Sequence, residues 1–461
     1  MRKTLIFALI AVMATSCSIY RKYQRPEDLP VDSLYRAELI ANPEDTSSFG
    51  NMPWEELFTD PYLKDLIDSG LVHNTNLQTA ILTVEQAKAS LHAAKWAYSP
   101  SLNLTPQGSL TSIDANKPTY SYDLGGNVSW DIDLFGNLLN AKRGAQATLL
   151  QQQAYQQAVR SQIISTIATS YYALLMMDEQ VRISDESVVI WKEQVRTMEA
   201  QLKVGLINEN AVTQARANLY SLEASCAQLK QQQKETENAL CALLGRTSGT
   251  IERSTLAEQV LPETVSTGVP LYLLSNRPDV YQAEMALASA YYTTNQARAA
   301  FYPQLTLSGS AGWTNSLGQA VSNPAGVLIN AIAQLAQPIF NKGQLKANLK
   351  SSKAAEEIAK LNYKQTILNA GQEVNDALFA IETAGIMLEK HQAQCVDLER
   401  TVYTADKLYK NSAAGSYLEI LTARQSLLNA QLSVISDKYN QLAYTVTLYQ
   451  ALGGGRESGQ E

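Results

Sequence analysis

The chain has 461 residues, 45% of them apolar and 18% charged, and this composition excludes a disordered protein. Lysine and arginine total 37 against 44 acidic residues, a net charge of −7, which argues against a nucleic-acid-binding protein. Beyond the N-terminus no apolar run is long enough to span a bilayer as a helix, so a helical-bundle transporter is excluded, whereas alternating β-strands escape such a search.

Residues 1–16 have the features of a secretion signal, with a basic pair, a short apolar stretch and small residues at the end. A cysteine follows at once, as in a bacterial lipobox. We therefore expect cleavage before Cys17 and diacylation of its side chain; an ordinary signal peptide cleaved nearby is the alternative. Ser18, in place of an aspartate, suits transfer to the outer membrane. Residues 17–49 would then form a lipidated N-terminal extension.

The remaining chain contains two copies of one unit. Three segments recur in the same order at a nearly constant offset: 98–104 as 301–307, 133–137 as 338–343, and 211–219 as 419–427. We therefore expect repeats at 50–245 and 271–452. A connector at 246–270 would join them, and 453–461 would be a flexible C-terminal tail.

Each copy predicts three helices. The spacing of apolar residues and the absence of helix breakers place them, in chain order, at 62–96, 138–203, 211–244, 278–301, 343–410 and 417–452. The two longest would each extend about 100 Å. Helices of this length must pack side by side, as in a coiled coil. In each copy the two shorter helices together match the length of the long one.

Two strands are predicted between the first and second helix of each copy, because apolar and polar side chains alternate there. The four strands begin near Leu102, Tyr120, Leu305 and Val327. Each would have one apolar and one polar face. Bacterial membrane barrels start at eight strands, so four strands cannot close one, whereas three chains would supply twelve. The expected fold is mainly α with a membrane β-barrel: a homotrimer in which four strands per chain form one closed barrel and coiled-coil-like helices form a periplasmic α-barrel.

Four segments carry a resemblance to a known family. Residues 276–313 (NRPDVYQAEMALASAYYTTNQARAAFYPQLTLSGSAGW), 204–219 (VGLINENAVTQARANL), 417–431 (YLEILTARQSLLNAQ) and 23–28 (YQRPED) are similar to outer-membrane efflux proteins, in the lipidated branch of the TolC-like channels. The resemblance covers nearly the whole mature chain.

This resemblance implies a lipid-anchored exit duct in the outer membrane, with a long periplasmic extension. Its partners would be a periplasmic adaptor protein, a proton-driven inner-membrane pump of the RND type and outer-membrane lipid, with no nucleic acid and no cofactor. The duct would pass small molecules without catalysis. The sequence leaves open an ABC pump in place of the RND type. It also leaves open two other functions: a protein-secretion duct of the same architecture, and a lipid-anchored periplasmic scaffold with no pore.

The ends of the helices hold the candidate site residues. Gly205 suits a left-handed turn that closes the first hairpin, and its apolar neighbours Val204 and Leu206 would either pack within the hairpin or dock the adaptor. We interpret Arg277, Pro278 and Asp279 as a structural motif, because proline suits a first helical turn and aspartate complements its dipole.

At the second hairpin, the turn is expected around Ser412 to Gly415. Glu419 stands where relatives carry an acidic residue near the constriction of the tunnel. Three symmetry copies would then form a carboxylate ring that attracts cations. The alternative is a solvated charge on the helix face. Thr422 occupies the place of a second family acid, so the ring would be single.

No catalytic or metal site is predicted. Cys226, Cys241 and Cys395 are odd in number and are expected to be buried apolar side chains. The three histidines show no metal-ligand spacing.

Overall fold

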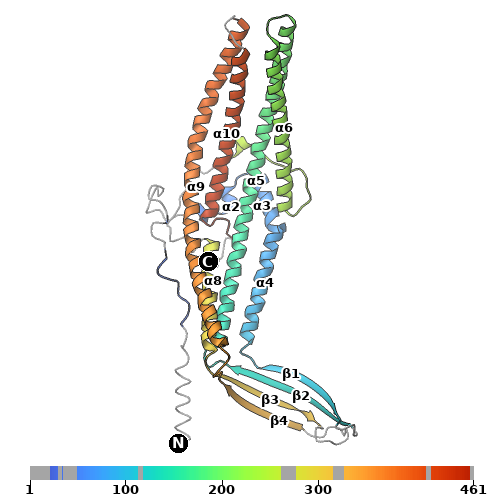
Figure 1. Cartoon of the computed structure of the whole chain (residues 1–461), viewed down its shortest axis with the longest axis vertical. Coiled ribbons are helices and arrows are strands. Elements are labelled where there is room, and N and C mark those ends of the chain that lie inside the picture. Colours follow the sequence, from blue (N-terminus) through green and yellow to red (C-terminus); the bar gives the residue numbers. More distant parts are fainter. Residues whose placement is uncertain are drawn as a thin grey trace. The chain divides into compact units, whose positions relative to one another are not determined.

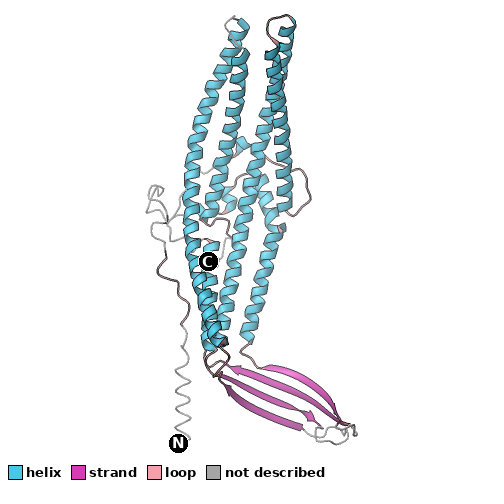
Figure 2. Ribbon diagram, viewed as in Figure 1, coloured by secondary structure: helices cyan, strands magenta, loops and turns pink. Residues whose placement is uncertain are grey.

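The structure is a computed structural model of the chain, and it describes residues 21–29, 34, 49–112, 118–260, 277–314, 327–411 and 417–456 (Figure 1). It is mainly helical, with one four-stranded antiparallel sheet (Figure 2). Cys17 and the predicted turn from Ser412 to Gly415 lie outside the described residues. None of the described helices contains a stretch that is long and apolar enough to cross a membrane.

The described elements run in the order that the sequence predicts. Two short elements, η3 (Phe49–Asn51) and α2 (Trp54–Leu57), come first, and η4 (Leu256–Glu258) lies in the connector. The first set of main elements is α3 (Pro61–His73), α4 (Thr75–Trp96), β1 (Ser101–Thr111), β2 (Thr119–Ile132), α5 (Asn137–Lys203) and α6 (Glu209–Leu243). The second set is α8 (Pro278–Ala299), β3 (Gln304–Thr314), β4 (Val327–Ala336), α9 (Gln344–Asn411) and α10 (Tyr417–Ala451). The predicted long helices and strands are confirmed.

The prediction of one helix over 62–96 is wrong, because Asn74 ends α3 and starts α4. Its backbone is extended (φ −65°, ψ 123°). Its side-chain oxygen accepts hydrogen bonds from the amides of Asn76 (2.9 Å) and Leu77 (3.1 Å), which caps α4. Its amide group donates to the Leu243 carbonyl (2.8 Å) at the end of α6. Asn74 therefore joins the α3–α4 junction to the last turn of α6.

The chain divides into two compact units, and α4, α5, α8 and α9 each contribute residues to both. One unit comprises residues 1–29, 82–154 and 281–365, and contains the whole sheet. The other comprises 30–81, 155–280 and 366–461, and contains the hairpins α5–α6 and α9–α10.

In the first unit, the register of the sheet places like side chains in rows across all four strands. Leu104, Gly126, Ala311 and Ile329 form an apolar row, whereas Asn103, Asn127, Ser310 and Asn330 form a polar row. Because side chains alternate between faces, one face of the sheet is apolar and the other is polar. This is the pattern predicted from the sequence.

In the second unit, an apolar core joins the first hairpin to α10. Trp191 and Met198 on α5 pack with Val212 on α6 and with Leu421 and Leu428 on α10. Near this core, the Tyr409 hydroxyl of α9 donates to the Gln201 side chain of α5 (2.6 Å). Both hairpins are thus held together by burial and by a cross-hairpin hydrogen bond.

The connector is fixed to the helices of this unit by two buried polar networks. Asp60, the cap of α3, accepts hydrogen bonds from Tyr171 (2.6 Å), Gln259 (2.9 Å) and Ser254. Arg253 forms ion pairs with Asp178 on α5 (2.5 Å) and Glu237 on α6 (2.7 Å). Burial disfavours the charge of Asp60, but its hydrogen bonds from Ser254, Tyr171 and Gln259 outweigh burial and hold its pKa below the usual value.

Replacing Asp60 by alanine should lower the free energy of unfolding by about 2–4 kcal/mol, since it removes a helix cap and leaves the buried Tyr171 hydroxyl short of an acceptor. Because the folded pKa of Asp60 is depressed, its contribution is present above the unfolded pKa and is lost as the pH falls through the folded value. Asp60→Asn should lack this acid-dependent loss. Circular dichroism at 222 nm during denaturant unfolding, at several pH values, measures both effects. Asp65→Ala, at an exposed position of α3, is the control and should change little; equal losses for both alanine variants would contradict the prediction.

Candidate functional site

The sheet exposes its apolar face. Leu102 on β1 and Ile329 on β4 are each 76% exposed, and Leu104 is 72% exposed. Within the described chain, β1 and β4 each pair on one side only, so both edges of the sheet carry unpaired backbone groups. Apolar side chains that are this exposed and lie together on one face of a sheet indicate contact with lipid or protein.

The opposite face is polar and internally hydrogen-bonded. Asn127 donates to Thr105 (2.7 Å), and Thr306 donates to the Asp131 carboxylate (2.7 Å). In the middle of this face β2 and β3 approach each other closely, so that a Cβ on Gly312 would lie 2.6 Å from the Gly125 Cα. Only glycine fits there, and the resulting hollow of about 220 Å³ is lined mostly by polar side chains that include Asp123.

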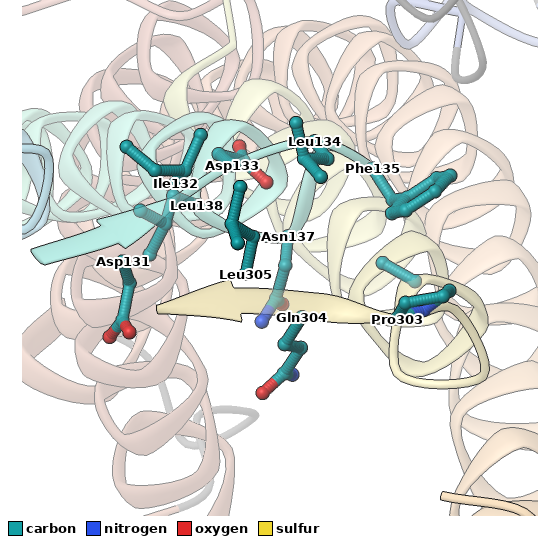
Figure 3. Close-up of a pocket in the computed structure, with 11 residues that line it drawn as sticks. Asp131, Ile132, Asp133, Leu134, Phe135, Asn137, Leu138, Pro303, Gln304 and Leu305 are labelled. Atoms are coloured by element: carbon teal, nitrogen blue, oxygen red, sulfur yellow. The ribbon is translucent and has the colours of Figure 1, made fainter. Parts of the chain in front are cut away.

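A smaller cavity of about 80 Å³ lies where β2 leads into α5 and beside the start of β3 (Figure 3). Two carboxylates, Asp131 and Asp133, line it. Each already has a partner: Thr306 donates to Asp131, and the Leu139 amide donates to Asp133 (2.8 Å). Its size and its satisfied carboxylates suit a joint between sheet and helix rather than a substrate site.

The end of the first hairpin is a compact turn with apolar side chains outside. Gly205 has φ +75°, the left-handed conformation expected for it. Its amide bonds to the Leu202 carbonyl, and the Leu206 amide bonds to the Gln201 carbonyl (3.0 Å each), which closes the last turn of α5. Val204 is 70% exposed and Leu206 73% exposed. Neither belongs to the core of the hairpin, where Leu202 and Ile207 pack instead.

At the second hairpin, α10 begins at Tyr417 and places Glu419 in its first turn. Glu419 and Leu418 are exposed, whereas Ile420 and Leu421 are buried. Among the salt bridges of the described residues, none involves Glu419. The exposure of Glu419 lets its carboxylate contact water.

The motif at the start of α8 joins three helices of the second unit. The buried Arg277 guanidinium contacts both oxygens of Asp279 (3.0 and 2.6 Å), Glu373 on α9 (2.7 Å) and the Ala451 carbonyl at the end of α10 (3.0 Å). Pro278 is the first residue of α8. These contacts join the start of α8 to α9 and to the end of α10.

The comparisons with known proteins agree with this geometry. The sequence pattern of the outer membrane efflux protein family matches residues 66–246 and 270–454. The cation efflux system protein CusC of Escherichia coli K12 is 30% identical over 449 residues, which cover 97% of this chain and 98% of that protein. The probable outer membrane lipoprotein SilC of Salmonella typhimurium is 30% identical over 460 residues, covering 98% of each chain.

Solved structures give the same answer. The crystal structure of CusC aligns with a TM-score of 0.82 over 95% of this chain and 100% of that chain, at 30% identity. The open state of the Neisseria gonorrhoeae MtrE outer membrane channel aligns with a TM-score of 0.83 over 95% of this chain and 98% of that chain, at 25% identity. The chain belongs to the outer membrane efflux protein family. It is an outer-membrane efflux channel.

Channels of this family are transport ducts rather than enzymes. Where the chain is described, no group of three or more histidine, cysteine or acidic side chains could hold a metal ion. Cys226 and Cys241 are buried, as expected, while Cys395 is only partly buried. Burial raises the pKa of the Cys226 thiol, as does its hydrogen bond to Asp185, so it is not a reactive thiolate.

Sequence reasoning missed the polar contacts that fix the connector and the hairpins. Tyr409 and Gln201 lie far apart in the chain, and no local pattern connects them. Arg253 carried no local signal either, since its neighbours Glu252 and Ser254 are polar and its need for a carboxylate partner follows only from its burial.

Proposed function

We propose that three copies of this chain close a single twelve-stranded β-barrel in the outer membrane, joined to a periplasmic tunnel of helices. The two-faced sheet with two free edges carries this proposal. Its strands alternate in direction, so β4 of one copy and β1 of the next would also be antiparallel. In lipid, unpaired backbone groups at an open edge are too costly, and closure by identical copies removes them. The apolar face would then contact lipid and the polar face would line the lumen.

The chain would be anchored by diacylated Cys17. Residues 21–29, which follow the anchor, lie along α8 and α9: Arg25 forms two hydrogen bonds with Glu284 (2.9 and 2.6 Å), and Asp28 pairs with Lys364 (2.6 Å). The name of SilC, an outer membrane lipoprotein, is consistent with such an anchor. We propose the repeats 50–245 and 271–452, with the connector 246–270, as the units from which the duct is built.

A periplasmic adaptor and a proton-driven RND-type pump would complete the transport system. The duct itself would conduct small molecules passively. Glu419 and the carboxylates Asp123 and Asp131 on the polar face favour cationic substrates, and CusC is named as a cation efflux protein. The RPD clamp at Arg277 to Asp279 is proposed to be structural, since it joins the ends of α8 and α10.

Disulfide trapping across the sheet edges tests the trimer. Asn103→Cys on β1 should be combined in turn with Asn330→Cys, Ile332→Cys and Gln334→Cys on β4, all on the polar face. Within one chain β1 and β4 are three strand spacings apart, about 14 Å, which is too far for a disulfide. At least one pair should therefore give covalent trimers on a denaturing gel. Asn103→Cys alone is the control, and monomers from every pair would contradict the proposal.

Glu419→Gln should lower the cation preference of the open channel several-fold, since three carboxylates around one axis would be lost together. The ratio of K⁺ to Cl⁻ permeability follows from reversal potentials of single channels in a planar bilayer under a salt gradient. Glu209→Gln, in the first turn of the other hairpin helix, is the matched control and should change the ratio less. An unchanged ratio in Glu419→Gln would refute the ring and favour a solvated surface charge.

The pair Val204→Asp and Leu206→Asp should weaken adaptor binding roughly tenfold or more, because charges would replace the exposed apolar side chains of the hairpin end. Binding of the cognate adaptor to the purified channel can be measured by surface plasmon resonance. Tyr220→Asp, an exposed residue on α6 beyond the tip, controls for added charge. Retained affinity in the double variant would leave Val204 and Leu206 without a docking role.

A further inference from the structure

A band of basic side chains surrounds the places where helices meet the sheet. Four helix segments adjoin the strands: 88–96 of α4, 137–153 of α5, 285–299 of α8, and 342–355 at the start of α9. They contain no acidic residue. Their basic residues are Lys88, Lys95, Lys142, Arg143, Arg298, Lys342, Lys346, Lys350 and Lys353. A chain with a net charge of −7 thus concentrates positive charge at one level.

Four of these lysines lie at or just before the start of α9. Lys346, Lys350 and Lys353 are four and three residues apart, so they share one face of α9, and Lys342 precedes its first turn. We call these four residues the lysine stripe. All four are exposed, and none forms a salt bridge within the described part of the chain.

Identical copies around a three-fold axis would bring few acidic residues to the sheet end of the stripe. A symmetric neighbour brings the same residues to the same level, and the only acidic residue in the loops between these helices and the strands is Asp133. Asp133 is already bound to the Leu139 amide (2.8 Å). Glu356 and Glu357 lie three and four residues after Lys353, but Lys342, Lys346 and Lys350 have no acidic residue within four positions along the chain. For these three lysines the counter-charge can come from outside the protein.

The surroundings of the stripe point to the membrane. Ile339 and Phe340, directly before it, are 97% and 85% exposed. Lysines beside exposed apolar side chains are typical of surfaces that insert at the boundary of a bilayer. Ile339 and Phe340 thus place exposed apolar side chains next to the positive charges of the lysine stripe.

The N-terminal segment shows which way this face of α9 points. Lys360 and Lys364 continue the line of the stripe, and both contact Asp28 (3.5 and 2.6 Å). From Asp28 back to Arg21, the segment moves along α8 from Glu284 towards Tyr291, in the direction of the sheet. Four more residues, which can reach about 14 Å, lead to Cys17. The described segment that leads back towards Cys17 thus runs on the stripe side of α9. With Cys17 as the proposed anchor, we expect this side to face lipid rather than the lumen.

From this arrangement we infer that the lysine stripe binds the headgroups of anionic phospholipids in the periplasmic leaflet of the outer membrane. The inference rests on the proposed lipid-facing barrel and Cys17 anchor, and adds a specific lipid chemistry at a specific place. The ammonium groups would contact phosphate oxygens while Ile339 and Phe340 enter the acyl region. Such contacts would fix the height of the sheet in the bilayer.

Native mass spectrometry of the full-length lipidated protein tests the inference. The protein in neutral detergent would be mixed with equal amounts of phosphatidylglycerol and phosphatidylethanolamine, and the ratio of the two lipids retained would be measured. Each lysine that reaches a headgroup contributes about a fivefold preference for the anionic lipid. The variant Lys342→Gln, Lys346→Gln, Lys350→Gln, Lys353→Gln should therefore lose roughly tenfold or more of the phosphatidylglycerol preference.

Two further variants make the test specific. A control with Lys192, Lys203, Lys390 and Lys407 each changed to glutamine removes the same charge from exposed positions of the second unit and should keep the lipid preference. Replacing the four stripe lysines by arginine should keep it as well. Equal lipid ratios in the wild type and the stripe variant would overturn the inference, as would a changed ion selectivity with unchanged lipid binding, which would place the lysines in the lumen.

The same spectra separate this inference from the proposed duct. They report the mass of the assembly and of the lipid on Cys17. Trimers that carry this lipid but retain both phospholipids equally would leave the duct intact and refute only the stripe. Monomers without an acylated Cys17 would instead refute the duct and its anchor.

Discussion

A β-sheet that contacts lipid must pair the backbone groups of both its edges, and this constraint explains most of the chain around the strands. Four strands with one apolar face cannot meet it alone, and the proposed closure by identical copies would meet it. The same constraint accounts for the uniform parity of the rows, because a single slipped strand would bring polar side chains to the lipid face. Inside the sheet, Gly125 and Gly312 allow β2 and β3 to approach so closely that a Cβ on Gly312 would lie 2.6 Å from the Gly125 Cα.

The helices meet a different requirement, since a long helix must be covered along its length by shorter ones. The covering helices join end to end in both sets of main elements, and each junction is polar. Asn74 bonds to the Leu243 carbonyl in the first, and Arg277 bonds to the Ala451 carbonyl in the second. The last carbonyls of a helix lack partners within it, so a donor from the next helix both satisfies them and sets the alignment. The two sets of elements thus form equivalent junctions with different side chains.

The sequence predicts the periodic parts of this structure and misses the specific ones. Alternation of period two is a local signal, so the strands and their faces could be derived, as could the long helices from uninterrupted runs. The break at Asn74 could not, because asparagine in a polar helical stretch is common, and its role depends on a carbonyl 169 residues away. The Asp60 network and the Tyr409–Gln201 hydrogen bond could not be predicted for the same reason, because their partners lie far apart in the chain. The left-handed conformation of Gly205 could be predicted because its turn depends on only a few neighbouring residues.

The position of the charged residues in this protein says more about what they contact than the net charge does. A net charge of −7 suggests an acidic surface, yet the segments beside the sheet are purely basic, and the carboxylates of the sheet lie on its polar face. Salt screens interactions beyond about 8–10 Å, so groups this dispersed act on whatever lies next to them and not as one field. Carboxylates on a polar face act on solutes, and lysines beside an exposed apolar loop act on headgroups. One chain can therefore favour cations inside a channel and anionic lipid around it without the two preferences cancelling.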